Sequence, residues 1–156
     1  MKKILFFCCT CLLLAAPGFS PRIFAPRVFA QTAAEIENLL TTSAVTYEQA
    51  ASFVLRAADI PVSGRAFEYA AKQKWLSAKA APGGKAILKE VSGLIMGAFN
   101  MKGGIMYSDS KSPRYAYREL VYQGIIQGRA DPDQLVSGDR LMFMVGKVLS
   151  RIEGEL

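Results

Sequence analysis

The chain has 156 residues, of which 51% are hydrophobic, with a formal net charge of +6 and no histidine. This length is typical of a single domain, and the lack of histidine removes the side chain most often used as a general base and as a metal ligand. Four basic residues and no acidic ones lie in residues 1–30, so residues 31–156 carry 15 basic and 13 acidic side chains, a net charge of +2. So small a charge argues against a nucleic-acid-binding protein, which needs a basic patch in its folded part.

The first 30 residues have the order of a secretory signal peptide. Lys2 and Lys3 precede an apolar run at residues 4–16, and a small-residue exit follows at residues 28–30. The apolar run of 13 residues is shorter than the ~20 residues of a membrane-spanning helix. We therefore expect residues 1–30 to be removed, with an uncleaved N-terminal anchor as the alternative.

All three cysteines, Cys8, Cys9 and Cys11, lie inside this leader. Only four residues separate Lys3 from Cys8, which favours a soluble exported protein over a lipoprotein. After cleavage no cysteine remains to form a disulfide. The sequence thus predicts a protein of the bacterial periplasm or cell envelope that does not insert into a membrane once the leader is removed.

The first two helices of the exported part are predicted at residues 32–40 and from Thr46 to near Pro61. In the second helix, Thr46 and Gln49 have the spacing of a capping box, in which the Thr46 hydroxyl accepts from the Gln49 amide and the Gln49 side chain reaches back. Behind this box the apolar residues recur at helical spacing: Ala50, Phe53, Val54 and Ala57.

Two more helices are predicted, one capped by Ser63 and running to about Trp75, the other at residues 85–101. Phe67, Ala70 and Ala71 are expected to face inward in the first of these helices. In the other, Gly93 and Gly97 lie four residues apart, and their missing side chains would let another helix approach closely.

A long loop is predicted at residues 103–111, followed by two helices. Ser112-Pro113 is a typical helix start, with a capping hydroxyl and a proline at the first helical position. Ser137 is expected to cap the last helix, with Asp139 in its first turn. No stretch shows the sustained alternation of a strand, so the sequence predicts an all-α protein.

Two windows 50 residues apart, 66–99 and 116–149, align without a gap. Pro82 aligns with Pro132, and the pair Trp75-Leu76 aligns with Ile125-Ile126. Each window has the pattern of a helix, a short apolar link, a proline turn and a second helix, which indicates a structural repeat. The alternative is an ordinary helix–loop–helix with incidental glycines.

In the second window the apolar pair lies between two glycines, Gly124 and Gly128. Gly124 is expected to end its helix in the left-handed conformation, which carries no Cβ penalty at glycine. Ile125 and Ile126 are then expected to turn into the core, where burying both stabilises the fold by roughly 3–6 kcal/mol.

The stretch Gly124-Ile125-Ile126 and Gly128, with Ala116 and Leu120 before it, resembles a repeat of the surface-layer homology (SLH) family. The resemblance implies one compact domain at residues 31–156 built of helical hairpin repeats: a partial repeat at 32–60 and repeats at 63–101 and 112–151. SLH domains are non-catalytic modules that hold proteins to cell-wall glycans through grooves between the repeats.

The chain departs from this family at its charged motif residues. Tyr47, Leu88 and Gly138 stand where the family has its motif arginine, so an anionic sugar would lack a bidentate partner. Where the family has glutamate, the three units have Gln49, Glu90 and Arg140. We therefore expect the fold to be kept while the ligand has changed or disappeared.

The candidate ligand-binding residues are those expected near the grooves between repeats: Thr46, Glu90, Arg118, Arg129, Ser137 and Arg140. Tyr115 and Tyr122, close to Arg118, are further candidates because aromatic faces with basic neighbours can bind sugars. Tyr117 falls on the core stripe and is expected to pack. Trp75 aligns with Ile125 and is expected in the core.

No catalytic residue, metal or cofactor is predicted. Asp131, Asp133 and Asp139 lack the spacing of an EF-hand, and Pro82-Gly83-Gly84-Lys85 lacks the glycine spacing and preceding strand of a phosphate loop. The expected function is non-catalytic binding to cell-wall glycan or peptidoglycan. The alternative is a periplasmic adaptor that binds an envelope protein through the same fold and has no sugar site.

Overall fold

The protein is described by a computed structural model that places residues 33–128 and 130–154. Within these residues it forms seven helices and no strand, so the predicted all-α fold class is confirmed. The helices are α1 (Ala33–Thr41), α2 (Tyr47–Ala57), α3 (Ala66–Lys72), α4 (Leu88–Ala98), α5 (Ile105–Ser110), α6 (Pro113–Tyr122) and α7 (Gly138–Gly154). The predicted signal peptide at residues 1–30 lies outside the described residues.

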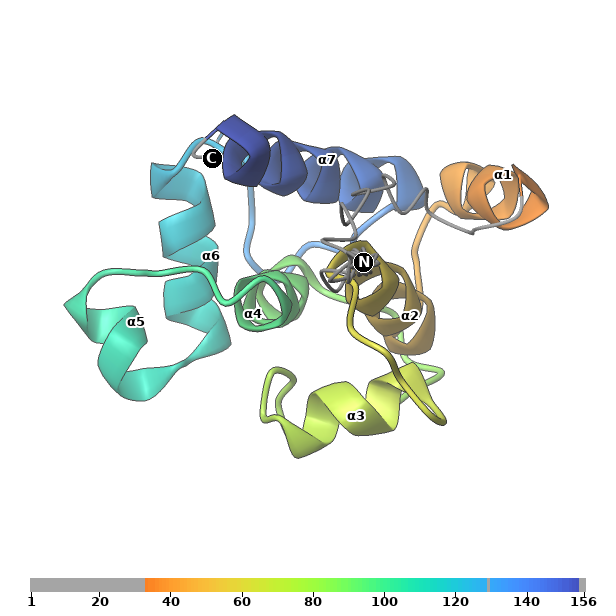
Figure 1. Cartoon of the computed structure of the whole chain (residues 1–156), viewed down its shortest axis with the longest axis horizontal. Helices are drawn as coiled ribbons and strands as arrows, with labels where there is room; N and C mark the ends of the chain where they lie inside the picture. The colour runs from red at the N-terminus through yellow and green to blue at the C-terminus, as the bar shows by residue number, and fades with distance from the viewer. Residues whose placement is uncertain (1–32, 129, 155–156) are drawn as a thin grey trace, which may run out of the picture.

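Helix α4 is the centre of the molecule. It packs against α2 and α6, while α3 packs on α2 and α1 packs on α7 (Figure 1). Its side chains Leu88, Val91, Leu94 and Ile95 are fully buried because neighbours cover the helix on several sides. No helix in the described part of the chain combines the length and apolarity that a membrane crossing requires.

The apolar pair Ile125-Ile126 is buried as predicted, with exposed fractions of 2% and 3%. Gly124 and Gly128, on either side, have φ angles of +72° and +76°, in the left-handed region that favours glycine. Gly124 therefore ends α6 and directs Ile125 and Ile126 into the core, and Gly128 directs the chain back to the surface.

Three links that precede helices form a closed ring of backbone hydrogen bonds. The amide of Val45 donates to the carbonyl of Val136 (2.9 Å), the amide of Val136 to that of Ala86 (3.0 Å), and the amide of Ala86 to that of Val45 (2.8 Å). All three residues are fully buried. The ring holds together the starts of α2, α4 and α7, which are distant in sequence.

Four helices end in the same way, with a left-handed residue after the last turn. At Asp59, Lys74, Asn100 and Gly124 the following amide bonds the carbonyl five residues back, for example Trp75 to Ala70 (3.1 Å) and Ile125 to Leu120 (2.9 Å). This is the Schellman arrangement. Of these four helices, only α6 has a glycine at the left-handed position. Asp59, Lys74 and Asn100 therefore hold a backbone conformation that L-residues rarely adopt.

The helix starts confirm some predictions and correct others. The capping box of α2 is present, with Thr46 Oγ1 accepting from the Gln49 amide at 3.3 Å and Gln49 Oε1 accepting from the Thr46 amide at 2.9 Å. The predicted cap at Ser63 is wrong, because α3 begins only after Arg65. Ser112 precedes α6 with Pro113 at its first position, as predicted, but its side chain makes no capping hydrogen bond.

Two further predictions fail for reasons of tertiary contact. The stretch 103–111 contains helix α5 instead of a long loop, and Tyr107 on this helix is buried. Ala71 on α3 is exposed, because this short helix buries Ala66 and Ala70 and packs Phe67 and Tyr69 partly against the core. A six-residue helix that is anchored by one tyrosine is too short to leave a periodic signal in the sequence.

The paired glycines of α4 do admit close neighbours. A Cβ on Gly93 would lie 3.0 Å from the Trp75 carbonyl oxygen and 3.6 Å from Cα of Pro113, the first residue of α6. A Cβ on Gly97 would lie 2.3 Å from the indole ring of Trp75. Gly93 therefore lets both the Trp75 backbone and the start of α6 approach α4. Gly97 lets the indole ring of Trp75, in the link after α3, approach the same helix.

Candidate functional site

The structure gives separate local roles to four of the six predicted ligand residues: Thr46, Glu90, Ser137 and Arg140. Thr46 serves the capping box of α2, and Arg140 donates to Oε1 of Gln134 at 3.0 Å. Ser137 bonds the carboxylate of Asp139, an interaction that lowers the pKa of that carboxyl together with the backbone amide of Arg140. Arg129 lies outside the described residues.

Glu90 has an internal role that the sequence did not indicate. Its side chain is buried, with 5% exposure, and Oε2 accepts a hydrogen bond from the Ser77 amide at 2.8 Å. The carboxylate thus fixes the link between α3 and α4. A buried acid that is engaged in this way serves the fold.

The positions at which the SLH resemblance predicts a motif arginine are also internal. Tyr47, Leu88 and Gly138 are the first residues of α2, α4 and α7, and all three are buried. Burial raises the pKa of Tyr47, which favours its neutral form. A charged side chain at these positions would enter the core, so a ligand site has to be built from other residues.

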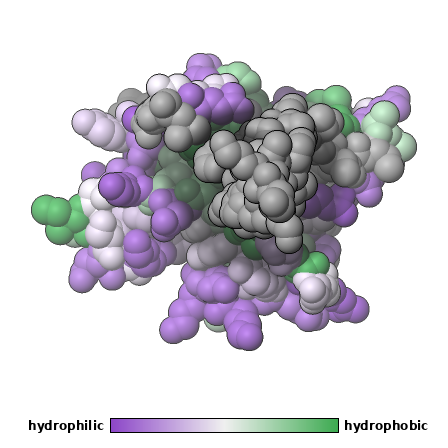
Figure 2. All heavy atoms as spheres, in the orientation of Figure 1, coloured by the Kyte–Doolittle hydropathy of each residue, from purple (hydrophilic) through white to green (hydrophobic). Residues whose placement is uncertain are grey.

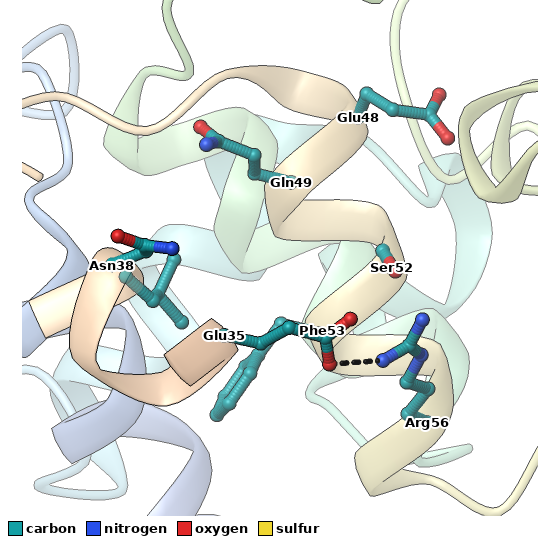
Figure 3. A pocket seen from close by; sticks show the side chains of 8 residues that line it. Glu35, Asn38, Glu48, Gln49, Ser52, Phe53 and Arg56 are labelled. Carbon is teal, nitrogen blue, oxygen red and sulfur yellow. Dashed lines mark hydrogen bonds and ion pairs between the residues drawn. The ribbon is translucent and has the colours of Figure 1, made fainter. Parts of the chain in front are cut away.

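One pocket, of about 320 Å³, lies between α1 and α2 (Figure 3). Phe53 lies between the two helices, and Asn38 and Gln49 lie on its α1 and α2 sides. Arg56 donates to Oε2 of Glu35 at 2.9 Å, an ion pair that ties the two helices together. Gln49 is used by the capping box of α2, so much of the polar lining already serves either the α1–α2 ion pair or the start of α2.

A second pocket, of about 520 Å³, lies between α5 and α6 and gathers the predicted tyrosine–arginine group. Tyr115, Arg118 and Tyr122 line it, and the Arg118 guanidinium carbon lies 6.0 Å from the centroid of the Tyr115 ring. Tyr117 is packed against the core, as predicted, and its hydroxyl donates to the carbonyl of Ala130. The three candidates for a sugar surface therefore do come together, on an open and largely apolar surface.

A third pocket, of about 320 Å³, combines aromatic, amide and cationic groups, and we call it the Trp75 groove. It runs between the link after α3, the end of α4 and helix α5. Its floor is formed by Gly93, Met96, Gly97 and Met101, and its polar and aromatic lining by Gln73, Lys74, Trp75, Asn100, Tyr107 and Lys111.

Trp75 is only partly buried, which corrects the expectation that it belongs to the core. Its ring packs on Gly97 and meets Tyr69 edge to face, with centroids 5.9 Å apart. The fully buried member of the aligned pair is its neighbour Leu76, with 6% exposure. The tryptophan is thus fixed on both sides while it lines the groove.

Backbone strain is concentrated in the same groove. Among the residues that the structure describes, four that are not glycine have a positive φ: Asp59 (53°), Lys74 (60°), Asn100 (47°) and Lys111 (49°). Three of these four line the Trp75 groove. Left-handed non-glycine residues cost of order 1 kcal/mol each and gather at functional sites.

The electrostatics of the groove are those of a site for neutral or anionic groups. The ammonium of Lys111 lies 4.9 Å from the ring centroid of Tyr107, and burial raises the pKa of the Tyr107 hydroxyl so that it stays protonated. Two lysines and no carboxylate belong to the lining residues that the structure describes. Lysine ammonium groups, amides and a tyrosine hydroxyl together offer donors to hydroxyl or acid oxygens.

The sequence gave little indication of this groove. Its lining comes from three segments, around residues 74, 100 and 107, that pack together only in the folded chain. The one local signal is that Lys74 aligns with Gly124, a position that requires a left-handed residue. A lysine at a position that favours glycine suggests that its side chain is needed.

Comparison with known proteins adds no assignment: no family model matches the chain, and neither curated proteins nor solved structures include a detectable match.

Proposed function

We propose that the chain is a non-catalytic exported protein of the bacterial envelope that binds cell-wall glycan, such as peptidoglycan or a wall polymer, in the Trp75 groove. The observation that carries the proposal is the placement of three left-handed side chains, Lys74, Asn100 and Lys111, beside one partly exposed tryptophan. Strain of this kind persists only where the surrounding structure fixes it, and it clusters at functional sites.

The groove has the chemistry that a glycan needs. An aromatic wall gives apolar contact to a sugar ring, and a few placed polar groups orient the ligand. Gln73 and Asn100 offer amide donors and acceptors for hydroxyl groups, and Lys74 and Lys111 offer charge to acid groups of a wall polymer. Arg118, with Tyr115 and Tyr122, would extend the contact over α6.

The backbone ring supports the further proposal that the fold is built of SLH-like repeats at residues 32–60, 63–101 and 112–151. Ala86 and Val136 stand 50 residues apart, the same offset as the aligned windows. The amide of Glu48 donates to the Pro82 carbonyl (3.1 Å) and that of Lys89 to the Pro132 carbonyl (2.9 Å), so matching turns contact matching helix starts. In such an arrangement the Trp75 groove lies between the repeat at 63–101 and the connecting segment 102–111, which supplies Tyr107 and Lys111.

The test is a pull-down of the purified protein with cell wall from its host, comparing wild type with Lys74→Gly and Lys111→Ala. We expect either change to weaken binding by roughly tenfold, because a hydrogen bond from a charged donor contributes ~1.5–3 kcal/mol. Lys74→Gly also relieves strain, so it separates lost binding from lost folding.

The matched control is Asp59→Gly, the fourth left-handed position, which belongs to the end of α2 and not to the groove lining. It should leave wall binding unchanged. Wall binding that survives both groove substitutions would refute the proposal.

The alternative proposal, a periplasmic adaptor without a sugar site, is favoured by apolar side chains elsewhere on the surface. Tyr122 on α6 is 88% exposed and Phe143 on α7 is 49% exposed. If the protein ignores purified wall but binds one envelope protein, and Tyr122→Ala or Phe143→Ala abolishes that binding, the adaptor role replaces the glycan role.

A further inference from the structure

Helix α5 presents two large aliphatic side chains to solvent at one end of the molecule. Ile105 is 87% exposed and Met106 is 64% exposed, and both lie in the first turn of α5. Figure 2 shows a hydrophobic group projecting among hydrophilic ones at the end where Figure 1 places α5. Projecting apolar groups of this kind mark contact surfaces.

Basic side chains surround this tip. Lys102 and Lys111 flank α5 on its two sides, Arg114 and Arg118 follow on α6, and all four are exposed. The acidic residues of the same stretch are Asp109 and Glu119, so residues 102–119 carry four positive and two negative charges, a net +2. The rest of residues 31–156 carries 11 of each sign and is neutral.

We propose that the α5 tip, defined as Ile105 and Met106 with the flanking Lys102 and Arg114, adsorbs to an anionic phospholipid surface. The two aliphatic side chains would enter the boundary between headgroups and acyl chains while the cations contact the anionic headgroups. The proposed contact is peripheral: the α5 tip enters only the boundary region of the bilayer. It goes beyond the glycan proposal for the Trp75 groove, which neither Ile105 nor Met106 lines. Both residues do line the α5–α6 pocket with Tyr115, Arg118 and Tyr122.

A protein partner fits this surface less well than a membrane. Lysine and other charged residues are depleted at protein–protein interfaces, whereas here cations flank the apolar pair. An anionic bilayer offers both an apolar interior and a negative surface, which matches the two components of the tip. The concentration of the net positive charge at this one end also orients the molecule toward such a surface.

The experiment is co-sedimentation of the purified protein with vesicles of phosphatidylglycerol and phosphatidylethanolamine, and with vesicles of phosphatidylcholine alone. Ile105→Ser with Met106→Ser should weaken binding to the anionic vesicles by roughly tenfold or more, since two buried aliphatic side chains are lost. Lys102→Gln with Arg114→Gln should weaken binding to the anionic vesicles only, and added salt should do the same.

Phe143→Ser is the matched control, because Phe143 is an exposed apolar residue on α7 with a lysine ammonium 5.1 Å from its ring. It should bind as wild type does. The N-terminal segment is the same in all variants, so differences between them come from the substituted residues. All substituted side chains are exposed or at the surface, and circular dichroism should show unchanged helix content.

Equal vesicle binding by wild type and the double serine variant would overturn the proposal, as would an equal loss on Phe143→Ser. A double serine variant that binds vesicles normally but loses self-association, or loses a protein partner, would reassign the surface to that contact. The vesicles contain no glycan, so this outcome is independent of whether the Trp75 groove binds cell wall.

Discussion

The carbonyl oxygen of Leu39 occupies the space that a side chain at position 138 would need. A Cβ built on Gly138 would lie 1.7 Å from this oxygen and 2.6 Å from its carbonyl carbon. The end of α1 therefore sits directly on the start of α7, where the Gly138 amide also donates to the Thr42 carbonyl at 2.9 Å. This contact leaves no room for any side chain at position 138.

Gly138→Ala should displace α1 and destabilise the fold by ~1–3 kcal/mol, because overpacking against backbone cannot be relieved by a rotamer change. Equilibrium urea unfolding measures the effect. Gly146→Ala on the same helix is the matched control, since a Cβ there meets nothing within 4 Å. It should stabilise by ~1 kcal/mol, as alanine does in a helix interior. Equal effects of the two substitutions would show that α1 does not dock on α7.

Lys74→Gly and Gly124→Ala should shift stability in opposite directions. Both positions are left-handed helix ends, with φ of 60° and 72°. Glycine at position 74 removes a strain of ~1 kcal/mol, whereas alanine at position 124 introduces it. The midpoint of urea unfolding should rise for the first variant and fall for the second. A fall in both would mean that the Lys74 side chain stabilises the fold by more than its backbone strain costs.

Glu90→Ala should destabilise the fold by ~1–3 kcal/mol, because the partly buried Ser77 amide loses its acceptor. Glu90→Gln keeps an acceptor oxygen and should cost less. Hydrogen exchange of the Ser77 amide, measured by NMR, should accelerate in the alanine variant and change little in the glutamine variant. If Glu90→Gln abolished cell-wall binding while the fold stayed intact, Glu90 would return to the list of ligand residues.

Asp139 should contribute stability that disappears in acid. The Ser137 hydroxyl, followed by the Arg140 amide, lowers the pKa of the Asp139 carboxyl in the folded state. Because the folded pKa lies below the unfolded one, this contribution is complete above the ordinary aspartate pKa of about 3.9 and is lost as the pH falls through the lowered value.

Ser137→Ala tests this coupling. Carboxyl titration by NMR should show the pKa of Asp139 moving up toward its ordinary value in the variant. The variant should be less stable than wild type near neutral pH, and the gap should close in acid. A gap of constant size across the acid range would assign the effect of Ser137 to packing or to another hydrogen bond.

Much of the helical structure was predictable because its signals are local. The capping box at Thr46 and Gln49, the proline at the start of α6 and the glycine end at Gly124 each depend on residues within one turn. The apolar stripe of α4 likewise follows from a period of 3.6 residues. Where the local signal was weak, as at Ser63 or in the six residues of α5, the predictions failed.

The candidate site was harder to predict because it depends on contacts between distant segments. The sequence grouped Arg118 with Tyr115 and Tyr122 correctly, since these residues share one helix and its end. It misplaced Glu90, because a carboxylate that caps a distant backbone amide looks the same in sequence as an exposed one. It also placed Trp75 in the core, because alignment with Ile125 indicates which segment is apolar and not which side chain faces a groove.

By itself the sequence determined where most helices lie, which of their faces are apolar, and that Ile125 and Ile126 are buried between two glycines. Only the tertiary structure decided that Val45, Ala86 and Val136 close a ring, and that Lys74, Asn100 and Lys111 meet beside Trp75. The physical reason is the separation along the sequence between the residues that interact. Helix formation and capping are settled within a few residues, whereas backbone pairing between links and the lining of a groove depend on how whole helices pack.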